Sequence, residues 1–224
     1  MKKEITILFL VSLTFWDRMH AQTDTELWTG GDFNYKISQQ FSVKAEQVFK
    51  FNDTISHFKS AFTEISLKYK PAKFFAAAGN YRFIENPPDK NAHRFSGDIM
   101  FYVGSKNFPL SFQSRHRFQH EVRIIDKRKE DYLRNKFTFD YNLTKLVDPF
   151  ISYEPFFRFN GKNEFRIMRY TFGLDWNITQ KWSAVTYYLF EKEVNVKNSV
   201  NTNIIGVMFS YTMKRTAPAR FEIK

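Results

Sequence analysis

Alternation between apolar and polar residues, repeated in about eleven segments, constrains the fold of this chain more than any other feature of its sequence. Between residues 41 and 51, Phe41 and Phe49 occupy one phase of the alternation, and Lys44 and Lys50 occupy the other. Because successive side chains of a β-strand point to opposite sides of the sheet, such a segment has one apolar and one charged face. The pattern predicts an all-β protein whose strands separate an apolar environment from an aqueous one.

The predicted strands are longer than those of ordinary soluble proteins. They cover residues 27–37, 41–52, 58–70, 74–84, 93–104, 110–122, 131–142, 149–160, 165–177, 181–192 and 202–213. Strands of globular proteins average about five or six residues, whereas a tilted strand needs about nine to eleven residues to cross a membrane. Because single-chain bacterial barrels have an even number of strands, we expect a transmembrane antiparallel up-and-down β-barrel of about twelve strands, with ten to twelve as the range.

The N-terminus has the three regions of a secretory signal peptide. Lys2 and Lys3 are followed by an apolar run from Ile5 to Phe15 and by the small residue Ala21. We therefore expect a signal peptide at residues 1–21 and a single barrel domain at residues 22–224. Export combined with a membrane barrel predicts the outer membrane of a Gram-negative bacterium. The chain has no cysteine, which excludes disulfides and a lipid-modified cysteine.

Connections between the predicted strands differ in length. Residues 38–40, 71–73 and 178–180 are expected to form tight turns, and residues 85–92 and 124–130 to form longer loops. Outer-membrane barrels place short turns in the periplasm and longer loops outside the cell, so the first strand should end on the periplasmic side. Within the eighth predicted strand, Pro155 cannot donate a ladder hydrogen bond, which predicts a β-bulge there.

Charged residues on the polar phase are expected to line the lumen of the barrel. The formal net charge is +11, but Lys and Arg are spread over most strands instead of forming one run, so nucleic acid is not an expected partner. The expected pattern is that arginines pair with carboxylates and fill much of the interior. The candidate lumen-lining residues are Lys44, Glu46, Lys50, Glu64, Lys68, Arg82, Arg94, Asp98, Arg115, Arg117, Arg134, Lys136, Asp140, Glu154, Arg158, Arg169 and Asp175.

The excess of positive charge on this wall suggests what the barrel could do. A crowded, basic lumen predicts at most a narrow pore that prefers anions, or a barrel that binds a ligand or a lipid. The identity of such a small molecule or ion does not follow from the residues. A secreted, soluble, lipocalin-like binding protein is the alternative, with an apolar interior and a polar exterior.

Catalytic chemistry has one candidate, the pair Ser114 and His116 on the sixth predicted strand. A serine activated by a histidine would make the protein an outer-membrane lipid hydrolase. However, both residues share the phase of Phe112 and Phe118, which points them toward lipid. We therefore expect a non-enzymatic protein. Five histidines without a recognisable ligand pattern predict neither a metal site nor a cofactor.

Several segments of the chain are similar to a known family. They are Trp28, 33–37, 45–52, 78–83, 93–95, 114–118, 133–136 and 205–211. Together they resemble the domain-of-unknown-function 2490 family (DUF2490), exported outer-membrane β-barrel proteins typical of Bacteroidota. The resemblance covers nearly all of the mature chain. It implies fold and location, with outer-membrane lipid, lipopolysaccharide and the barrel-assembly machinery as partners, and it supplies no catalytic residues.

Overall fold

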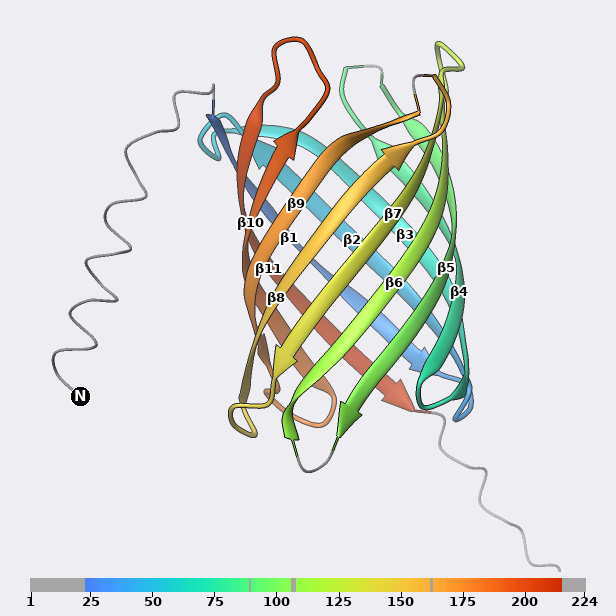
Figure 1. Ribbon diagram of the computed structural model, residues 1–224, viewed down its shortest axis with the longest axis vertical. Coiled ribbons are helices and arrows are strands. Elements are labelled where there is room, and N and C mark those ends of the chain that lie inside the picture. The colour runs from blue at the N-terminus through green and yellow to red at the C-terminus, as the bar shows by residue number, and fades with distance from the viewer. Residues whose placement is uncertain (1–22, 89, 106–107, 162, 215–224) are drawn as a thin grey trace, which may run out of the picture.

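Eleven long β-strands form a single closed barrel (Figure 1). The computed structural model describes residues 23–88, 90–105, 108–161 and 163–214. The strands are β1 (Thr23–Lys36), β2 (Phe41–Asn52), β3 (His57–Ala72), β4 (Phe75–Glu85), β5 (Ala92–Ser105), β6 (Phe108–Arg123), β7 (Lys129–Tyr141), β8 (Val147–Arg158), β9 (Glu164–Trp176), β10 (Trp182–Glu193) and β11 (Asn201–Lys214). The described residues contain no helix of the length and apolarity needed to cross a membrane.

The barrel closes through a parallel pair of strands. Each strand pairs in antiparallel fashion with its neighbours in sequence, but β1 pairs with β11 in parallel, from Thr23↔Asn201 to Lys36↔Lys214. The eleven strands lie within the expected range of ten to twelve, but the number is odd and not even as expected. An odd number of alternating strands leaves the first and last running in the same direction, and the evenly spaced bonds of a parallel ladder allow them to close the sheet.

Every predicted strand corresponds to a strand of the barrel, although the boundaries differ. The largest shift is at β1, which begins at Thr23, four residues before the predicted start at residue 27. Its first residues pair with Asn201 to Ile204 of β11. The predicted signal peptide at residues 1–21 lies outside the described residues.

Connections at the two ends of the barrel follow the predicted division. The connections at residues 37–40, 73–74 and 177–181 lie at one end, which we call the turn end. Those at residues 86–91 and 124–128 lie at the other, which we call the loop end. Because the strand count is odd, β1 begins at the loop end and β11 finishes at the turn end (Figure 1).

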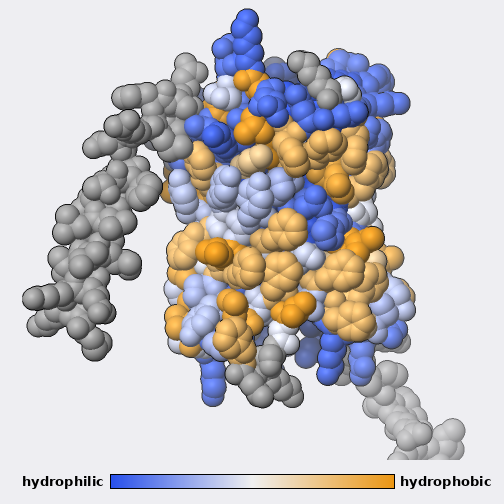
Figure 2. Space-filling view, viewed as in Figure 1, coloured by the Kyte–Doolittle hydropathy of each residue, from blue (hydrophilic) through white to orange (hydrophobic). Residues whose placement is uncertain are grey.

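The outer face of the barrel is apolar and largely exposed. Exposed large side chains on it include Phe33, Phe41, Phe49, Ile65, Leu67, Phe95, Ile99, Phe101, Phe118, Phe139, Ile151, Phe172, Tyr188, Ile205 and Phe209. In Figure 2, hydrophobic side chains make up most of the middle of the visible face, with a patch of more polar ones among them, and hydrophilic ones gather at both ends. Charged side chains such as Glu64, Asp98 and Arg117 are buried instead. The barrel thus has the opposite polarity to a soluble protein.

Two inward-facing glycines make room for aromatic rings. A Cβ atom at Gly206 of β11 would lie 2.0 Å from the ring of Tyr187 on β10, and one at Gly173 would lie 2.4 Å from the ring of Phe150. Gly97 differs, because a Cβ atom there would meet nothing within 4 Å. Glycine at 173 and 206 therefore lets rings pack flat against the inner wall of the barrel.

The irregularity predicted at Pro155 takes a different form. Opposite Pro155, the ladder between β7 and β8 is interrupted at Asn135 and the residue after it, while the register is the same on both sides of the gap. The missing N–H of proline accounts for this gap. The bulge itself lies on β9, where Arg166 is the extra residue between Phe165 and Ile167. The prediction of a bulge on β8 at Pro155 is therefore wrong.

Candidate functional site: three chambers in the barrel interior

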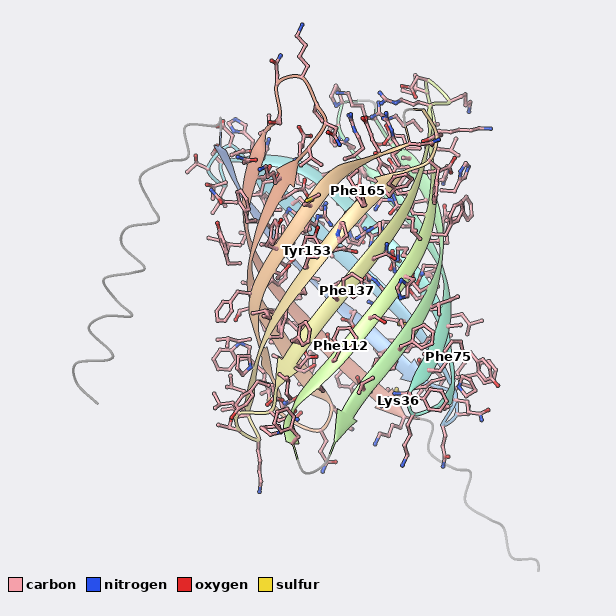
Figure 3. All side chains as sticks on the ribbon, viewed as in Figure 1. Lys36, Phe75, Phe112, Phe137, Tyr153 and Phe165 are labelled. Atoms are coloured by element: carbon pink, nitrogen blue, oxygen red, sulfur yellow. The ribbon has the colours of Figure 1, made fainter. Side chains whose placement is uncertain are left out.

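Within the described part of the chain, three cavities lie in series along the axis of the barrel. The turn-end chamber has a volume of about 880 Å³ and includes Lys36, Gln40 and Lys214 at the turn end of the barrel. The middle chamber has a volume of about 520 Å³ and includes Trp28, Lys136 and Leu189. The loop-end chamber has a volume of about 200 Å³ and reaches Asn86 and Lys90 in the connection between β4 and β5. Figure 3 shows Lys36 at the mouth of the turn end.

Charged side chains separate the chambers from one another. The turn-end and middle chambers share Lys44, Glu64, Arg115 and Arg117, so these residues form the partition between them. The middle and loop-end chambers share Lys50, Phe62, Arg82, Arg94 and Glu121. Both partitions are thus built mainly from long charged side chains that reach inward from different strands.

The first partition contains a chain of ion pairs across four strands. Glu64 of β3 accepts a hydrogen bond from Nε of Arg82 on β4 at 2.7 Å, and lies 3.9 Å from Arg117 of β6. Arg117 donates two hydrogen bonds to Asp98 of β5, at 2.6 and 2.7 Å. Asn80 of β4 donates a further hydrogen bond to Asp98 at 3.2 Å. Each carboxylate is therefore compensated by at least one arginine.

A second group of ion pairs centres on Glu154 of β8. Its Oε1 accepts hydrogen bonds from Arg115 of β6 at 2.7 Å and from Arg134 of β7 at 3.0 and 3.2 Å. Arg134 also donates to the side-chain oxygen of Gln119 at 3.0 Å. Since Glu154 and Arg134 are both buried, one carboxylate holds two guanidinium groups inside the barrel.

Further ion pairs link neighbouring strands around the wall. Arg94 donates to Glu121 at 2.8 Å, and Arg169 donates to Glu191 at 2.6 Å. Lys44 lies 3.0 Å from Glu46 on its own strand. Together with the two groups above, these pairs occupy much of the space that an open pore would leave to water.

Inward-facing aromatic rings contact several of the same cations. Nζ of Lys50 lies 3.8 Å from the ring of Trp28, and the guanidinium carbon of Arg169 lies 5.3 Å from that ring. The guanidinium of Arg82 lies 3.6 Å from the ring of Phe62. A cation over an aromatic face is attracted by the ring quadrupole. Because Trp28 is on β1 and Arg169 on β9, this contact reaches between strands that are not neighbours.

Most of the residues expected in the lumen lie along these chambers. The turn-end, middle and loop-end chambers are lined by Lys44, Glu46, Lys50, Glu64, Lys68, Arg82, Arg94, Asp98, Arg115, Arg117, Arg134, Lys136, Glu154 and Arg169 from that set. Asp140 instead lines a separate pocket of about 400 Å³ with Lys73 and Tyr102. Arg158 lies near the loop end and pairs with Glu164 at 3.8 Å. Asp175 faces Asp148 across the β8–β9 ladder.

The expected pairing of interior carboxylates with arginines holds only in part. Among the described residues, neither Asp140 nor Asp175 forms an ion pair with an arginine. Arg169 pairs with Glu191 instead, and Glu26 pairs with Lys59. Alternation along β10 could have identified Glu191, because it shares the phase of the inward-facing Tyr187 and Leu189. Cross-strand register, which decides the partners, is not visible in the pattern of one strand.

Several interior lysines have no acidic partner within the described part of the chain. Three of them, Lys36, Lys68 and Lys70, line the turn-end chamber. Lys68 donates a hydrogen bond to the Tyr102 hydroxyl at 2.9 Å. In the middle chamber, nine Lys and Arg side chains stand against six Asp and Glu side chains. The cations are Lys44, Lys50, Arg82, Arg94, Arg115, Arg117, Arg134, Lys136 and Arg169, and the acids are Asp32, Glu46, Glu64, Glu121, Glu130 and Glu154.

The Ser114 and His116 pair lies on the outer wall. Ser114 pairs in register with Phe101 and Phe137, both on the outward phase, and its side chain is covered by its neighbours. Nδ1 of His116 lies 2.7 Å from the side-chain oxygen of Asn135 on β7, not against Ser114. Within the described part of the chain, no three His, Asp or Glu side chains converge in a way that could hold a metal ion.

The fold and the chambers define the class: a closed all-β barrel with an apolar exterior and a charge-filled interior. A family model described as "Protein of unknown function (DUF2490)" matches residues 25–202. Because the match covers most of the chain, the protein belongs to this family, and the expected resemblance is confirmed. Comparison with curated proteins and with solved structures gave no match.

Proposed function

We propose that this protein is a non-enzymatic outer-membrane β-barrel of a Gram-negative bacterium, with an interior that is closed to bulk flow and favours anions. The observation that carries the proposal is the inverted polarity of the barrel. Exposed Phe, Ile and Leu side chains cover the middle of the outer wall, while charged side chains are held inside. The apolar side chains of such a wall are stable in contact with lipid, and strands of this length can cross the apolar layer of a membrane.

Side chains that divide the interior support low conductance. Barrels with about eight strands are just filled by side chains, whereas those with about sixteen leave an aqueous channel. Eleven strands lie between these limits, so the wall residues decide. Here the Glu64–Arg117–Asp98 and Arg115–Glu154–Arg134 groups extend into the axial space. Ions would have to pass between paired charges.

Net positive charge in the chambers supports the preference for anions. Lys36, Lys68 and Lys70 surround the turn-end chamber, whose two acids, Glu64 and Asp98, are already paired with arginines. A cleft lined by one sign of charge, with walls of low dielectric, raises the local concentration of the opposite ion. Cations would be depleted at this mouth.

Cell fractionation tests the location. We expect the mature chain in the outer-membrane fraction, resistant to washing with high salt and soluble only with detergent. Recovery in the soluble periplasmic fraction without detergent would contradict the proposal and favour the lipocalin-like alternative.

Planar-bilayer recording tests the interior. We expect purified wild-type protein to give little or no conductance, with residual current carried mainly by anions. The variants Lys36→Glu and Lys68→Glu should shift the reversal potential toward cations, because each replaces an unpaired cation at the mouth with an anion. Lys145→Glu, in the connection between β7 and β8, is the control for charge outside the chambers. Large cation-selective steps from the wild-type protein would contradict the charge assignment.

A further inference from the structure

The wall of the middle chamber is divided into a charged and an apolar side. Of the residues that β4 to β7 contribute to it, all are charged except Gln119 and Tyr132. The strands β10 and β11, by contrast, line it with Val185, Tyr187, Leu189, Met208 and Ser210. Phe150 and Phe156 of β8 and Ile167 of β9 continue the apolar side, which Glu154 and Arg169 interrupt. A cavity built only to hold paired charges has no need of such an apolar half.

Most arginines of the middle chamber are paired with carboxylates, but two of its lysines are not. Lys50 and Lys136 both line this chamber and are half-buried, and neither forms an ion pair within the described residues. Lys136 lies among Arg115, Arg134 and Arg169, and the acids near it, Glu154, Asp140 and Asp175, form no ion pair with it. Glu154 is itself bound by two arginines. Holding an ammonium group away from water without a counter-charge is unfavourable, so an anion on this side would stabilise the chamber.

We propose that the middle chamber binds a small amphipathic organic anion, with a carboxylate, sulfonate or phosphate group on the charged side and an apolar body on the other. The anionic group lies toward Lys136, on the part of the wall that also carries Arg115 and Arg134. The apolar body packs against Val185, Leu189 and Met208. A volume of about 520 Å³ is in the range of small-molecule sites, which are roughly 300–1,000 Å³. The inference deepens the proposed function, since it rests on a basic interior, but it does not depend on conduction.

Neither half of such a ligand alone would match the chamber. An inorganic anion would leave the apolar wall of β10 and β11 in contact with water. A neutral apolar molecule would leave Lys136 without an ion-pair partner. Both requirements together distinguish this site from the turn-end chamber, which is lined mainly by lysines and by polar side chains such as Asn34, Ser66 and Asn80.

Calorimetric titration of the purified mature chain in nonionic detergent tests the inference. The probes are 1-naphthyl phosphate, which has both parts, inorganic phosphate, which has the anion alone, and protonated 1-naphthylmethylamine, which has the apolar body with a positive charge. Titration into detergent alone gives the partition background. We expect one saturable site for 1-naphthyl phosphate, with a Kd at least tenfold below that of inorganic phosphate, and no saturable binding of the amine.

Two single substitutions test whether the ligand contacts both the charged and the apolar side of the middle chamber. Lys136→Met should weaken 1-naphthyl phosphate binding by about tenfold or more, the usual loss when a charge-assisted hydrogen bond is removed. Val185→Phe should fill the apolar side and weaken 1-naphthyl phosphate without changing the affinity for inorganic phosphate. Lys145→Met, which removes the same charge from an exposed connection, is the matched control and should bind like wild type.

Circular dichroism and thermal unfolding establish that each variant is folded, and Lys136→Gln replaces Lys136→Met if the latter is not. The inference is overturned if wild type binds 1-naphthyl phosphate no more tightly than inorganic phosphate, if it binds the amine equally well, or if the folded lysine variant keeps wild-type affinity. Since binding is measured in detergent without a membrane, loss of the proposed conductance or location would leave this result unaffected.

Discussion

At the scale of single residues, the interior is stabilised by charge pairs that are sensitive to the loss of one partner. Breaking a buried pair leaves an uncompensated charge, which costs more than the pair itself contributes. Glu154 is the clearest case, because it is buried and holds Arg115 and Arg134 at once. Removing its charge would leave two guanidinium groups facing each other.

We therefore expect Glu154→Gln to reduce the free energy of unfolding by about 3–5 kcal/mol. Glu85→Gln at the exposed end of β4 is the control and should change it by no more than about 0.5 kcal/mol. Denaturant unfolding of the protein refolded into lipid vesicles measures both values. Equal values for the two variants would show that the Glu154 ion pairs contribute nothing to the fold.

Outer and inner residues at the same height should respond differently to a new charge. Ile151 is 55% exposed on the outer wall of β8, whereas Thr138 of β7 lies beside it in the sheet on the inward phase. In lipid, Ile151→Arg should lower the free energy of unfolding by roughly 2–4 kcal/mol. Thr138→Arg should cost less, because Asp140, two residues away on the same phase, has no arginine partner within the described residues. The same vesicle unfolding assay compares them, and an equal loss would contradict the assignment of faces.

At the scale of strands, packing between neighbours depends on where glycine replaces a side chain. Tyr187 of β10 covers Gly206 of β11 so closely that no Cβ atom fits without a shift of the ring. Gly97 on β5 has open space instead. Both glycines lie in strand interiors, so the two positions separate the effect of packing from that of strand propensity.

We expect Gly206→Ala to destabilise the barrel by about 1–3 kcal/mol, the usual cost of overpacking. Gly97→Ala should be neutral or slightly stabilising, because it only reduces the freedom of the unfolded chain. Thermal or denaturant unfolding of the two single variants measures this, and Tyr187→Leu in the Gly206→Ala background should recover part of the loss. If Gly97→Ala proved the more harmful change, the ring contact at Gly206 would not be the determinant.

Alternation in the sequence was sufficient to predict the strands and the inward phase, but not their partners. Lys44, Arg82 and Arg134 were all expected in the interior and all line its chambers. The pairing of Arg169 with Glu191 depends on register between β9 and β10, which no single strand encodes. The parallel pairing of β1 with β11 could not be predicted either, because it joins segments at opposite ends of the chain.

At the scale of the whole molecule, the chambers and their partitions follow from the size of the barrel. Eleven strands leave more space than side chains of one layer can fill, and arginines and carboxylates from adjacent and nearby strands pair inside it. The three cavities along the axis were not predictable from composition, because they arise where paired side chains from several strands converge. An apolar half in the middle chamber became visible only when β10 and β11 were placed opposite the charged strands.

The central claim is that the outer wall faces lipid, and single-cysteine labelling tests it most directly because the chain has no native cysteine. Ile151, Phe172 and Tyr188 are 55%, 56% and 47% exposed on the outer wall, and Ile125 in the connection between β6 and β7 is 66% exposed. In water, cysteines at these four positions would react with a water-soluble maleimide at similar rates. In vesicles containing the refolded protein, we predict that Ile125→Cys reacts at least tenfold faster than the other three variants, and that all four react equally after unfolding. Equal rates in the folded protein would contradict the claim that this wall faces lipid.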